Sequence, residues 1–403
     1  MTTSTSTRYA LSVLAALAVL SGCGGGPSQL GIASPIQQQS TAGVEHRTPL
    51  SLLRLQAQGK LPGPFPVPVL QQQLRQIEGH GRPYLGFHGD AAKVGIWATA
   101  SATDYLLGQS ANGRKEKTLI AIDVERHDCY DPIGVKVDGA QNVWVACAYN
   151  SNASASELLE YNRTGTLEQI YNWQPCPPSA SFCFTDGYDA AFDSKGHVFA
   201  SVAFYNYAVG SQEYARAGFE WWNAKSPNSP TLISTGNRCS PVCSLYFMDV
   251  DPSGNIWFDY SGVVGSQQGY GLAEITNPTT NPQIVYVLPI GTYQFAGGVY
   301  ISNAGKTLNV TDDIPRVIYQ YHMPLTPSSK PFNVLGPTPT NGIGVGSPSS
   351  GGFNKSETRL VEADGYGWLD IGIVSSNTWL RVQNPGGNFA LGLGGAAYTP
   401  SDK

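Results

Sequence analysis

The chain has 403 residues, of which 13% are charged, and its formal net charge is −5. Its basic residues form no stripe that would neutralise phosphates, so we expect no nucleic-acid partner. The sequence contains 46 Gly, 28 Pro and 21 Tyr but only 3 Met. This composition favours tight turns and short aromatic-rich strands, and it therefore predicts an all-β protein.

Residues 1–22 are typical of a signal peptide for export. Arg8 precedes an apolar run from Tyr9 to Leu20, which is shorter than the about 20 residues that a membrane-spanning helix needs. The run ends in Leu-Ser-Gly-Cys, which resembles the lipobox of bacterial lipoproteins. This resemblance implies that Cys23 is acylated, with palmitate for example, and becomes the first mature residue. An ordinary secretory signal, with Cys23 incidental, is the alternative.

The lipoprotein resemblance also implies a location in the bacterial cell envelope. Gly24 stands where lipoproteins kept at the inner membrane tend to carry Asp, which favours the outer membrane, the periplasm or the cell surface. Residues 23–82 are predicted to be a flexible tether, because they contain two tracts of three Gln and alternating prolines between Pro62 and Pro68. Residues 83–403 are expected to form the folded domain.

An even number of cysteines follows the tether, which favours disulfides in an exported protein. The six are Cys129, Cys147, Cys176, Cys183, Cys239 and Cys243. Of the 15 possible pairings, the local one is the hypothesis: Cys129–Cys147, Cys176–Cys183 and Cys239–Cys243. Zinc is the alternative, but no CxxC or HxxxH pair supplies its usual ligand spacing.

From about Pro83 the chain repeats a strand, an Asp/Gly turn and a second strand that opens on a large apolar residue. The copies are marked by Asp90, Asp138, Asp193, Asp251, Ser302 and Asp364. Further β-rich runs follow each marker, and recurrence at about 40–50 residues is typical of propellers. The sequence thus predicts a six-bladed β-propeller of four-stranded antiparallel blades, with five or seven blades as alternatives. We expect Trp144, Trp257 and Trp368 to pack between blades.

The stretch from Asp251 to Phe258, reading Asp-x-x-Gly-Asn-x-Trp-Phe, resembles the blade motif of NHL-repeat propellers and of the streptogramin B lyase family. It is more distantly similar to gluconolactonase-like calcium propellers. The resemblance covers about residues 83–400 and implies a fold rather than a function, because such propellers include hydrolases, lyases and interaction modules.

Propeller sites usually lie at one mouth of the central channel, where the innermost strands begin. The residues seven positions before the markers are Pro83, Asp131, Asp186, Ser244, Phe295 and Glu357. Asp131, Asp186 and Glu357 would form an acidic rim suited to Ca²⁺ or Mg²⁺, as in the gluconolactonase-like propellers. The interpretation that we favour is that these Asp residues begin turns. None of the positions is Asn, unlike the lactonase pattern.

Candidates for general-base chemistry are few. The lyase family uses histidines and a glutamate with Mg²⁺, but no His-x-His is present, and only His88 and His127 stay plausible as bases. Residues 125–131 are rich in titratable groups, and an inter-blade loop with ion pairs and a disulfide is the favoured interpretation. The stretch Tyr205–Tyr214 is rich in tyrosine and is predicted to be a loop. Together with Trp221-Trp222, it forms either an aromatic patch for sugar or protein partners or part of the packing.

The sequence predicts a membrane-anchored extracytoplasmic lipoprotein whose propeller is a binding or scaffold module, and a monomer. The alternative is a metal-dependent hydrolase or lyase that uses Ca²⁺ or Mg²⁺ at the channel mouth.

Overall fold

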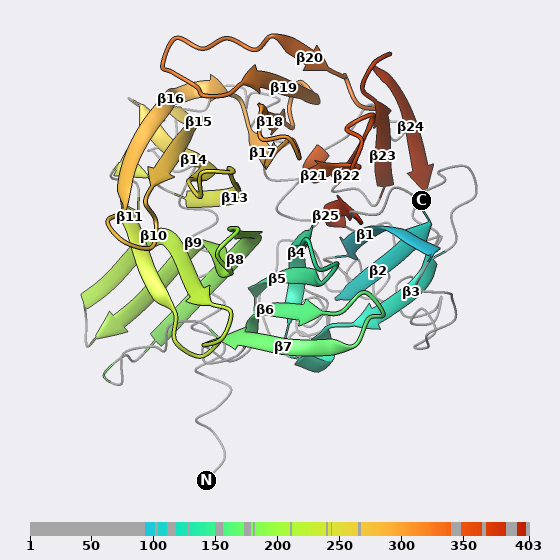
Figure 1. Cartoon of the computed structure of the whole chain (residues 1–403). Coiled ribbons are helices and arrows are strands. Elements are labelled where there is room, and N and C mark those ends of the chain that lie inside the picture. The colour runs from blue at the N-terminus through green and yellow to red at the C-terminus, as the bar shows by residue number, and fades with distance from the viewer. Residues whose placement is uncertain are drawn as a thin grey trace, which may run out of the picture.

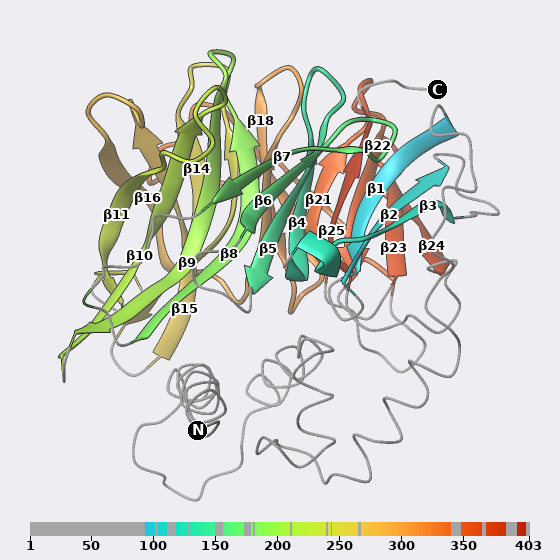
Figure 2. The ribbon, with the colours of Figure 1, turned by 90° about the horizontal axis from the view of Figure 1, so that it is seen from below.

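The computed structural model describes residues 93–100, 104–110, 118–127, 129–149, 156–172, 179, 182–209, 212–238, 241–242, 244–264, 267–339, 348–364, 368–383 and 393–399. In these residues the chain is almost entirely β-strand, with one short 3₁₀-helix, η4 (Glu125–His127). The strands form six four-stranded antiparallel blades arranged in a ring around a central axis, as Figures 1 and 2 show from two directions. The predicted six-bladed propeller is confirmed.

The blades are named A to F here, and their strands are given from the axis outward. Blade A has β25 (Leu393–Tyr398), β1 (Val94–Ala100), β2 (Tyr105–Ser110) and β3 (Thr118–Asp123). Blade B has β4 (Tyr130–Val137), β5 (Val143–Tyr149), β6 (Ser156–Tyr161) and β7 (Leu167–Asn172). Blade C has β8 (Phe182–Phe192), β9 (His197–Val209), β10 (Gln212–Asn223) and β11 (Thr231–Arg238), with β12 (Pro241–Val242) added at its edge.

The second half of the ring is built in the same way. Blade D has β13 (Ser244–Val250), β14 (Ile256–Val264), β15 (Gln267–Thr276) and β16 (Gln283–Tyr293). Blade E has β17 (Ala296–Ile301), β18 (Thr307–Asp312), β19 (Val317–His322) and β20 (Asn333–Leu335). Blade F has β21 (Pro348–Phe353), β22 (Arg359–Asp364), β23 (Trp368–Ile373) and β24 (Thr378–Gln383).

The Asp/Gly turns join the innermost strand of a blade to the next strand, and local hydrogen bonds explain why the pattern repeats. Asp251 accepts backbone hydrogen bonds from Ser253 (2.8 Å) and Asn255 (3.0 Å), and its other oxygen accepts one from the Trp257 indole (3.2 Å). Asp138 makes the equivalent bond to the Trp144 indole at 3.1 Å. Gly254 has φ 86°, a conformation that favours glycine. One Asp therefore fixes both the turn and the following tryptophan.

The tryptophans that follow these turns pack between blades, as predicted. Trp144 lies 5.0 Å from the Phe192 ring of blade C, and it shares a core cluster with Trp222. Trp257 belongs to the cluster that joins blades D and E. The side chain of Trp368 lies outside the described residues. Burying such rings contributes several kcal/mol per blade interface.

The two ends of the chain close the ring. The C-terminal strand β25 is the innermost strand of blade A and pairs antiparallel with β1, so that Trp97 lies opposite Ala397. This arrangement leaves no open edge between the first and last blades.

The closure shifts the repeat in the last blade. The prediction that Asp364 marks its turn was wrong, because Asp364 ends β22. Asn354 makes the turn instead and accepts a hydrogen bond from the Arg359 amide at 2.9 Å. Asp90 lies outside the described residues.

The stretch Tyr205–Tyr214 is not a loop, because it belongs mainly to the long hairpin of β9 and β10, in which Tyr207 pairs with Tyr214. Trp222 is fully buried and donates its indole hydrogen to the Asn172 carbonyl of blade B at 3.2 Å, so it packs between blades. Trp221 is half-buried and packs against His197, with ring centroids 5.2 Å apart. Among the described residues, none lies in a helix long and apolar enough to cross a bilayer.

Candidate functional site

The innermost strands approach one another closely around the axis, and glycine makes this approach possible. A Cβ on Gly134 of β4 would come within 2.4 Å of the Tyr188 carbonyl oxygen and 2.6 Å of the Asp189 carboxylate. A Cβ on Gly395 of β25 would lie 2.8 Å from the Ile133 carbonyl oxygen. Larger residues at these positions would push the blades apart, so the glycines set the width of the centre.

In every blade the pairing between the innermost strand and its neighbour has a register shift. In blade A the shift lies between residues 98 and 100 of β1, opposite β25. In the innermost strands of the other blades it lies between residues 132/135, 186/190, 245/248, 296/298 and 348/351. Such bulges expose backbone groups that need partners. Polar side chains of the second strands satisfy them in several blades. The Ser201 hydroxyl accepts a hydrogen bond from the Asp189 amide (2.9 Å). In the same way, the Asp259 carboxyl group accepts one from the Phe247 amide (2.7 Å), and the Asp312 carboxyl group accepts one from the Phe295 amide (2.9 Å).

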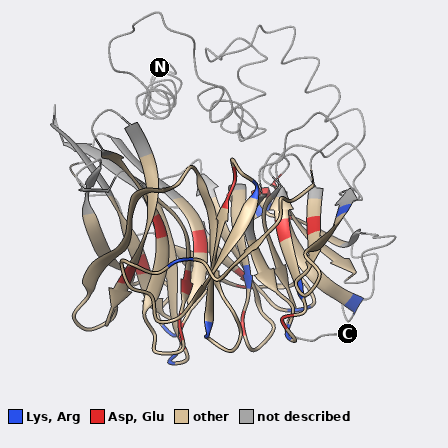
Figure 3. Cartoon of the chain, turned by 90° about the horizontal axis from the view of Figure 1, so that it is seen from above, with Lys and Arg blue, Asp and Glu red and all other residues tan. Residues whose placement is uncertain are grey.

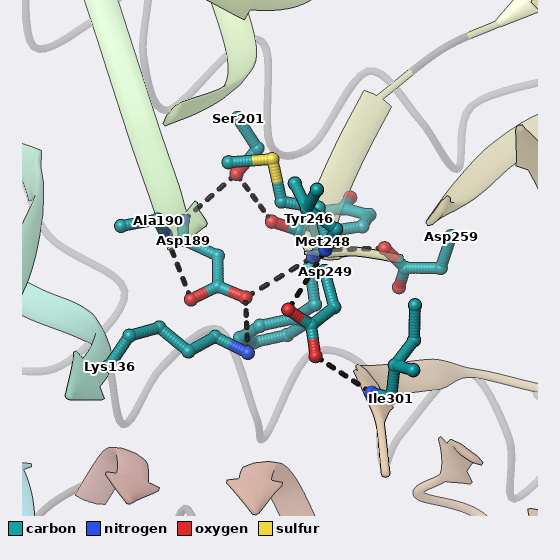
Figure 4. Close-up of polar contacts among 11 residues, drawn as sticks. Lys136, Asp189, Ala190, Ser201, Tyr246, Met248, Asp249, Asp259 and Ile301 are labelled. Carbon is teal, nitrogen blue, oxygen red and sulfur yellow. Dashed lines mark hydrogen bonds and ion pairs between the residues drawn. The ribbon is translucent and has the colours of Figure 1, made fainter. Parts of the chain in front are cut away.

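A lysine and two aspartates meet at the axis (Figure 4). Lys136 of blade B, with its side chain 12% exposed, places Nζ 3.5 Å from the Oδ2 atom of the fully buried Asp189 of blade C. The same Asp189 oxygen accepts a hydrogen bond from the Met248 amide of blade D at 3.2 Å. Asp249 accepts hydrogen bonds from Val250 (2.9 Å) and from Ile301 of blade E (2.7 Å). We call Lys136, Asp189 and Asp249 the axial cluster.

The electrostatics of the axial cluster follow from burial and from this pairing. Burial raises the pKa of Asp189 to about 6, although the Lys136 ammonium and two backbone amides oppose the rise. Burial lowers the pKa of Lys136, but Asp189 and Asp249 outweigh this effect and raise it. The lysine is therefore a permanent cation rather than a nucleophile near neutral pH.

Polar contacts continue from blade to blade beyond the axial cluster. Tyr300 of blade E donates a hydrogen bond to Glu362 of blade F at 2.5 Å. Thr99 of blade A accepts from the Gly395 amide (2.9 Å) and donates to the Ile133 carbonyl of blade B (2.5 Å). Blades F and A meet through a parallel bridge between Ser350 and Gly395. Neighbouring blades are thus joined by polar contacts all around the ring.

Acidic residues lie within the strands of the ring, and several are buried, whereas many of the described basic residues lie near turns (Figure 3). Burial raises the pKa of Asp259 and of Glu362 well above the ordinary carboxyl value. Desolvation is the largest cause, because burial penalises the charged form of each group.

The three carboxylates predicted for a metal occupy different parts of the blades. Asp131 lies near the start of β4 and Asp186 lies within β8, but their side chains lie outside the described residues. Glu357 is in the turn after β21, at the opposite end of an innermost strand, where it accepts a hydrogen bond from the Ala304 amide at 2.9 Å. The structure therefore does not bring Glu357 to the expected rim, because the count began from the misplaced marker Asp364.

No group of three or more His, Cys, Asp or Glu side chains suited to a metal occurs among the described residues, which do not include the Asp131 and Asp186 side chains. The metal site at these two residues stays a prediction.

The segment at residues 125–131 contains a predicted disulfide. Cys129 and Cys147 are bonded, with Cα atoms 5.1 Å apart, as the local pairing predicted. Cys176, Cys183, Cys239 and Cys243 lie outside the described side chains. Arg126 pairs with Asp123 at 3.4 Å, and the His127 ring lies 6.4 Å from that of Tyr161. His88 lies outside the described residues.

Comparison with protein-family models and with curated proteins finds no match. Among solved structures, a chain of the nidogen/laminin complex has a TM-score of 0.50 and 11% identity, covering 75% of this chain and 97% of that one. Regucalcin, a calcium-binding protein from Agrobacterium tumefaciens, gives 0.42 and 13%, covering 63% and 74% of the two chains. A gluconolactonase from Xanthomonas campestris gives 0.40 and 13%, covering 62% and 74%. At such identities, similarity shows the fold alone.

The axial cluster was not predicted from the sequence, because the candidate site was sought seven positions before each marker. Lys136 and Asp249 lie two residues before their markers, and Asp189 lies four before. Each is a charged residue within a short apolar run, which is unusual for a strand buried on both faces. That contrast is the signal that would have identified them.

Proposed function

We propose that this chain is a lipid-anchored extracytoplasmic protein whose propeller is a binding or scaffold module. The observation that carries this proposal is the use of the charged groups at the axis. The carboxylates of Asp189 and Asp249 accept backbone hydrogen bonds from the next blade, and Lys136 forms an ion pair with Asp189. Groups engaged in this way hold the ring together rather than approach a substrate.

The remaining candidates for chemistry also favour a binding role. A nucleophile or general base needs a neighbouring group that activates and orients it. Lys136 is held as a cation, and Asp259 caps the β-bulge of its own blade. Rigid blades with variable connections are a scaffold on which recognition usually depends on loops.

Attachment to a membrane rests on the Leu-Ser-Gly-Cys ending at Cys23. More than one acyl chain is needed for stable anchoring, and lipoprotein processing supplies it at such a cysteine. Mass spectrometry of the full-length gene product expressed in bacteria should find an acylated N-terminal Cys23. The Cys23→Ser variant should lose this mass and leave the membrane fraction. Unmodified Cys23 in the wild-type protein would contradict the anchoring.

The competing function is a metal-dependent hydrolase or lyase, and metal analysis separates the two. The purified full chain should contain no stoichiometric Ca²⁺ or Mg²⁺, and its melting temperature should not change between added Ca²⁺ and chelator. Metal that is bound by the wild-type protein and lost in both Asp131→Ala and Asp186→Ala would favour the enzyme. Glu357→Ala is the matched control, because Glu357 lies in the turn between β21 and β22, at the opposite end of the innermost strand from the expected rim.

A further inference from the structure

Exposed basic side chains gather at one end of blades E and F. This end, called the turn end here, carries the turn between the first and second strands of each blade and the connection between the third and fourth, because alternate connections of an antiparallel sheet share an end. In blade E the Met323 amide donates a hydrogen bond to the Lys306 carbonyl at 2.9 Å and joins the two connections. Figure 3 shows basic residues in turns along the lower edge of the ring. The exposed basic residues at the turn end of blades E and F are Lys306, Lys330, Lys355 and Arg359.

Little negative charge accompanies these basic residues. In the described turns of blades E and F the acidic residue is Glu357, and its carboxylate accepts a hydrogen bond from the Ala304 amide at 2.9 Å. Asn303 of blade E donates hydrogen bonds to the carbonyl groups of Asn354 (3.0 Å) and Lys355 (3.3 Å) of blade F, so the two turns are held together. The whole chain has a net charge of −5. The fold therefore concentrates here a positive charge that the sequence disperses.

Large apolar side chains are exposed beside the basic residues. Phe332 ends the connection that carries Lys330. The Asn377 side chain bonds both backbone groups of Gly336, at 2.8 and 3.1 Å, so the outer parts of blades E and F lie side by side. Exposed apolar side chains next to charged ones are typical of interaction sites. The exposed apolar residues of blades E and F are Phe332, Val334, Ile373 and Leu380.

The combination of cationic and bulky apolar side chains matches an anionic lipid surface. Each Lys or Arg near such a surface raises the affinity about 5-fold, and aromatic or aliphatic side chains enter the headgroup boundary. The position of the chain's N-terminal side agrees with this partner. Lys93, the first described residue, precedes β1, and the Thr399 amide at the turn end of β25 donates to the Gly95 carbonyl at 2.9 Å. The chain from Cys23 therefore joins the described domain at the turn end of the ring.

We propose that the turn end of blades E and F docks on the anionic phospholipid headgroups of the membrane that holds the Cys23 anchor. This inference rests on the lipid anchoring proposed above and specifies the orientation of the propeller. The anchor supplies the attachment, because headgroup attraction is screened by salt. Docking turns the opposite end of the ring, which carries the long β9–β10 hairpin, away from the membrane.

Hydrogen–deuterium exchange of the acylated full-length protein, reconstituted through its anchor into lipid vesicles, tests this orientation. Vesicles of phosphatidylcholine are compared with vesicles in which about a third of the lipid is phosphatidylglycerol. The backbone amides of residues 325–332 should exchange roughly 5-fold or more slowly on the anionic vesicles. The difference should vanish at about 1 M salt, where the Debye length falls to about 3 Å.

A triple variant removes the positive charge from blades E and F. Lys306→Gln, Lys330→Gln and Arg359→Gln change exposed side chains, so the protein should keep its melting temperature but exchange equally fast on both kinds of vesicle. The matched control removes the same amount of charge from exposed residues at the turn end of blades B and C, and it should keep the slow exchange on anionic vesicles. Its substitutions are Arg163→Gln, Lys195→Gln and Lys225→Gln.

The apolar contribution is tested by Phe332→Ser, which should make the amides of residues 325–332 exchange faster on anionic vesicles. Val263→Ser is its control, because Val263 is also 48% exposed but lies near the end of β14, at the opposite end of the ring. It should leave the exchange unchanged.

Equal exchange on the two kinds of vesicle would overturn the proposal and would favour an acidic protein as the partner of these side chains. Slow exchange that the triple variant in blades E and F retains would also overturn it, as would protection confined to the turns of blades B and C. Unmodified Cys23 contradicts the anchoring and the docking together, whereas an acylated protein without protection contradicts the docking alone. The two failures are therefore distinguishable.

Discussion

Replacing Lys136 by Met tests how the axial cluster stabilises the ring. Methionine keeps the unbranched apolar stem of lysine but removes the ammonium that lies 3.5 Å from Asp189. The buried carboxylate then loses the cation that opposes the rise of its pKa. In the variant, the folded-state pKa of Asp189 should therefore be higher still, and the effect on stability should depend on pH.

The pKa of Asp189 sets the sign and the size of this effect. In the folded wild-type protein that pKa is raised to about 6, whereas in the unfolded chain it is about 3.9. Protonated Asp189 therefore contributes to the free energy of unfolding. This contribution is fully present below about pH 4 and is lost as the pH rises to about 6. In Lys136→Met the loss continues above pH 6 at about 1.4 kcal/mol per pH unit. The wild-type and variant free energies of unfolding should thus diverge above pH 6, by about 1.4 kcal/mol for each unit by which the pKa of Asp189 in the variant exceeds that in the wild type.

Urea unfolding of both proteins at a series of pH values between 5 and 8.5 measures this divergence. Adding Asp189→Asn to Lys136→Met should abolish it, because no titrating carboxyl group is left at that position. Lys306→Met removes an exposed lysine in a turn and should show no such dependence. A difference between wild type and Lys136→Met that stays constant over this pH range would refute the reasoning.

Two further predictions concern the disulfide and the closure of the ring. Replacing Cys129 and Cys147 together by Ala should lower the free energy of unfolding by roughly 3 kcal/mol, because the bond spans 18 residues; an unchanged urea midpoint under oxidising conditions would contradict this. Ending the chain at residue 392 removes β25, so blade A should lose its innermost strand and the protein its resistance to protease. A truncated protein with wild-type circular dichroism and protease resistance would show that the closure is dispensable.

The blade pattern was predictable from sequence where its causes are local. Asp138 and Asp251 hydrogen-bond to residues only two to six positions ahead, so the turn and the following tryptophan are encoded in one short motif. The disulfide between Cys129 and Cys147 was predictable for a similar reason, since its loop is short. The repeat period then predicted the number of blades.

The repeat failed at the ends of the chain, where closure replaces local pairing. In blade F the turn is made by Asn354, with one residue more than the Asp turns, so the Asp-Gly pair at Asp364 was mistaken for the marker. This error carried Glu357 into the predicted metal site, whereas its carboxylate binds the Ala304 amide of the neighbouring turn.

By itself, then, the sequence determined the repeating unit of this protein, because each turn and its tryptophan are stabilised by contacts within a few residues. Only the tertiary structure decided how the units close and which charges meet at the axis. The Gly395 amide reaches Thr99 across 296 positions of the chain, and Met248 reaches Asp189 across 59. No local pattern specifies such pairs, because they form only when the bulged inner strands of different blades are brought together around one axis.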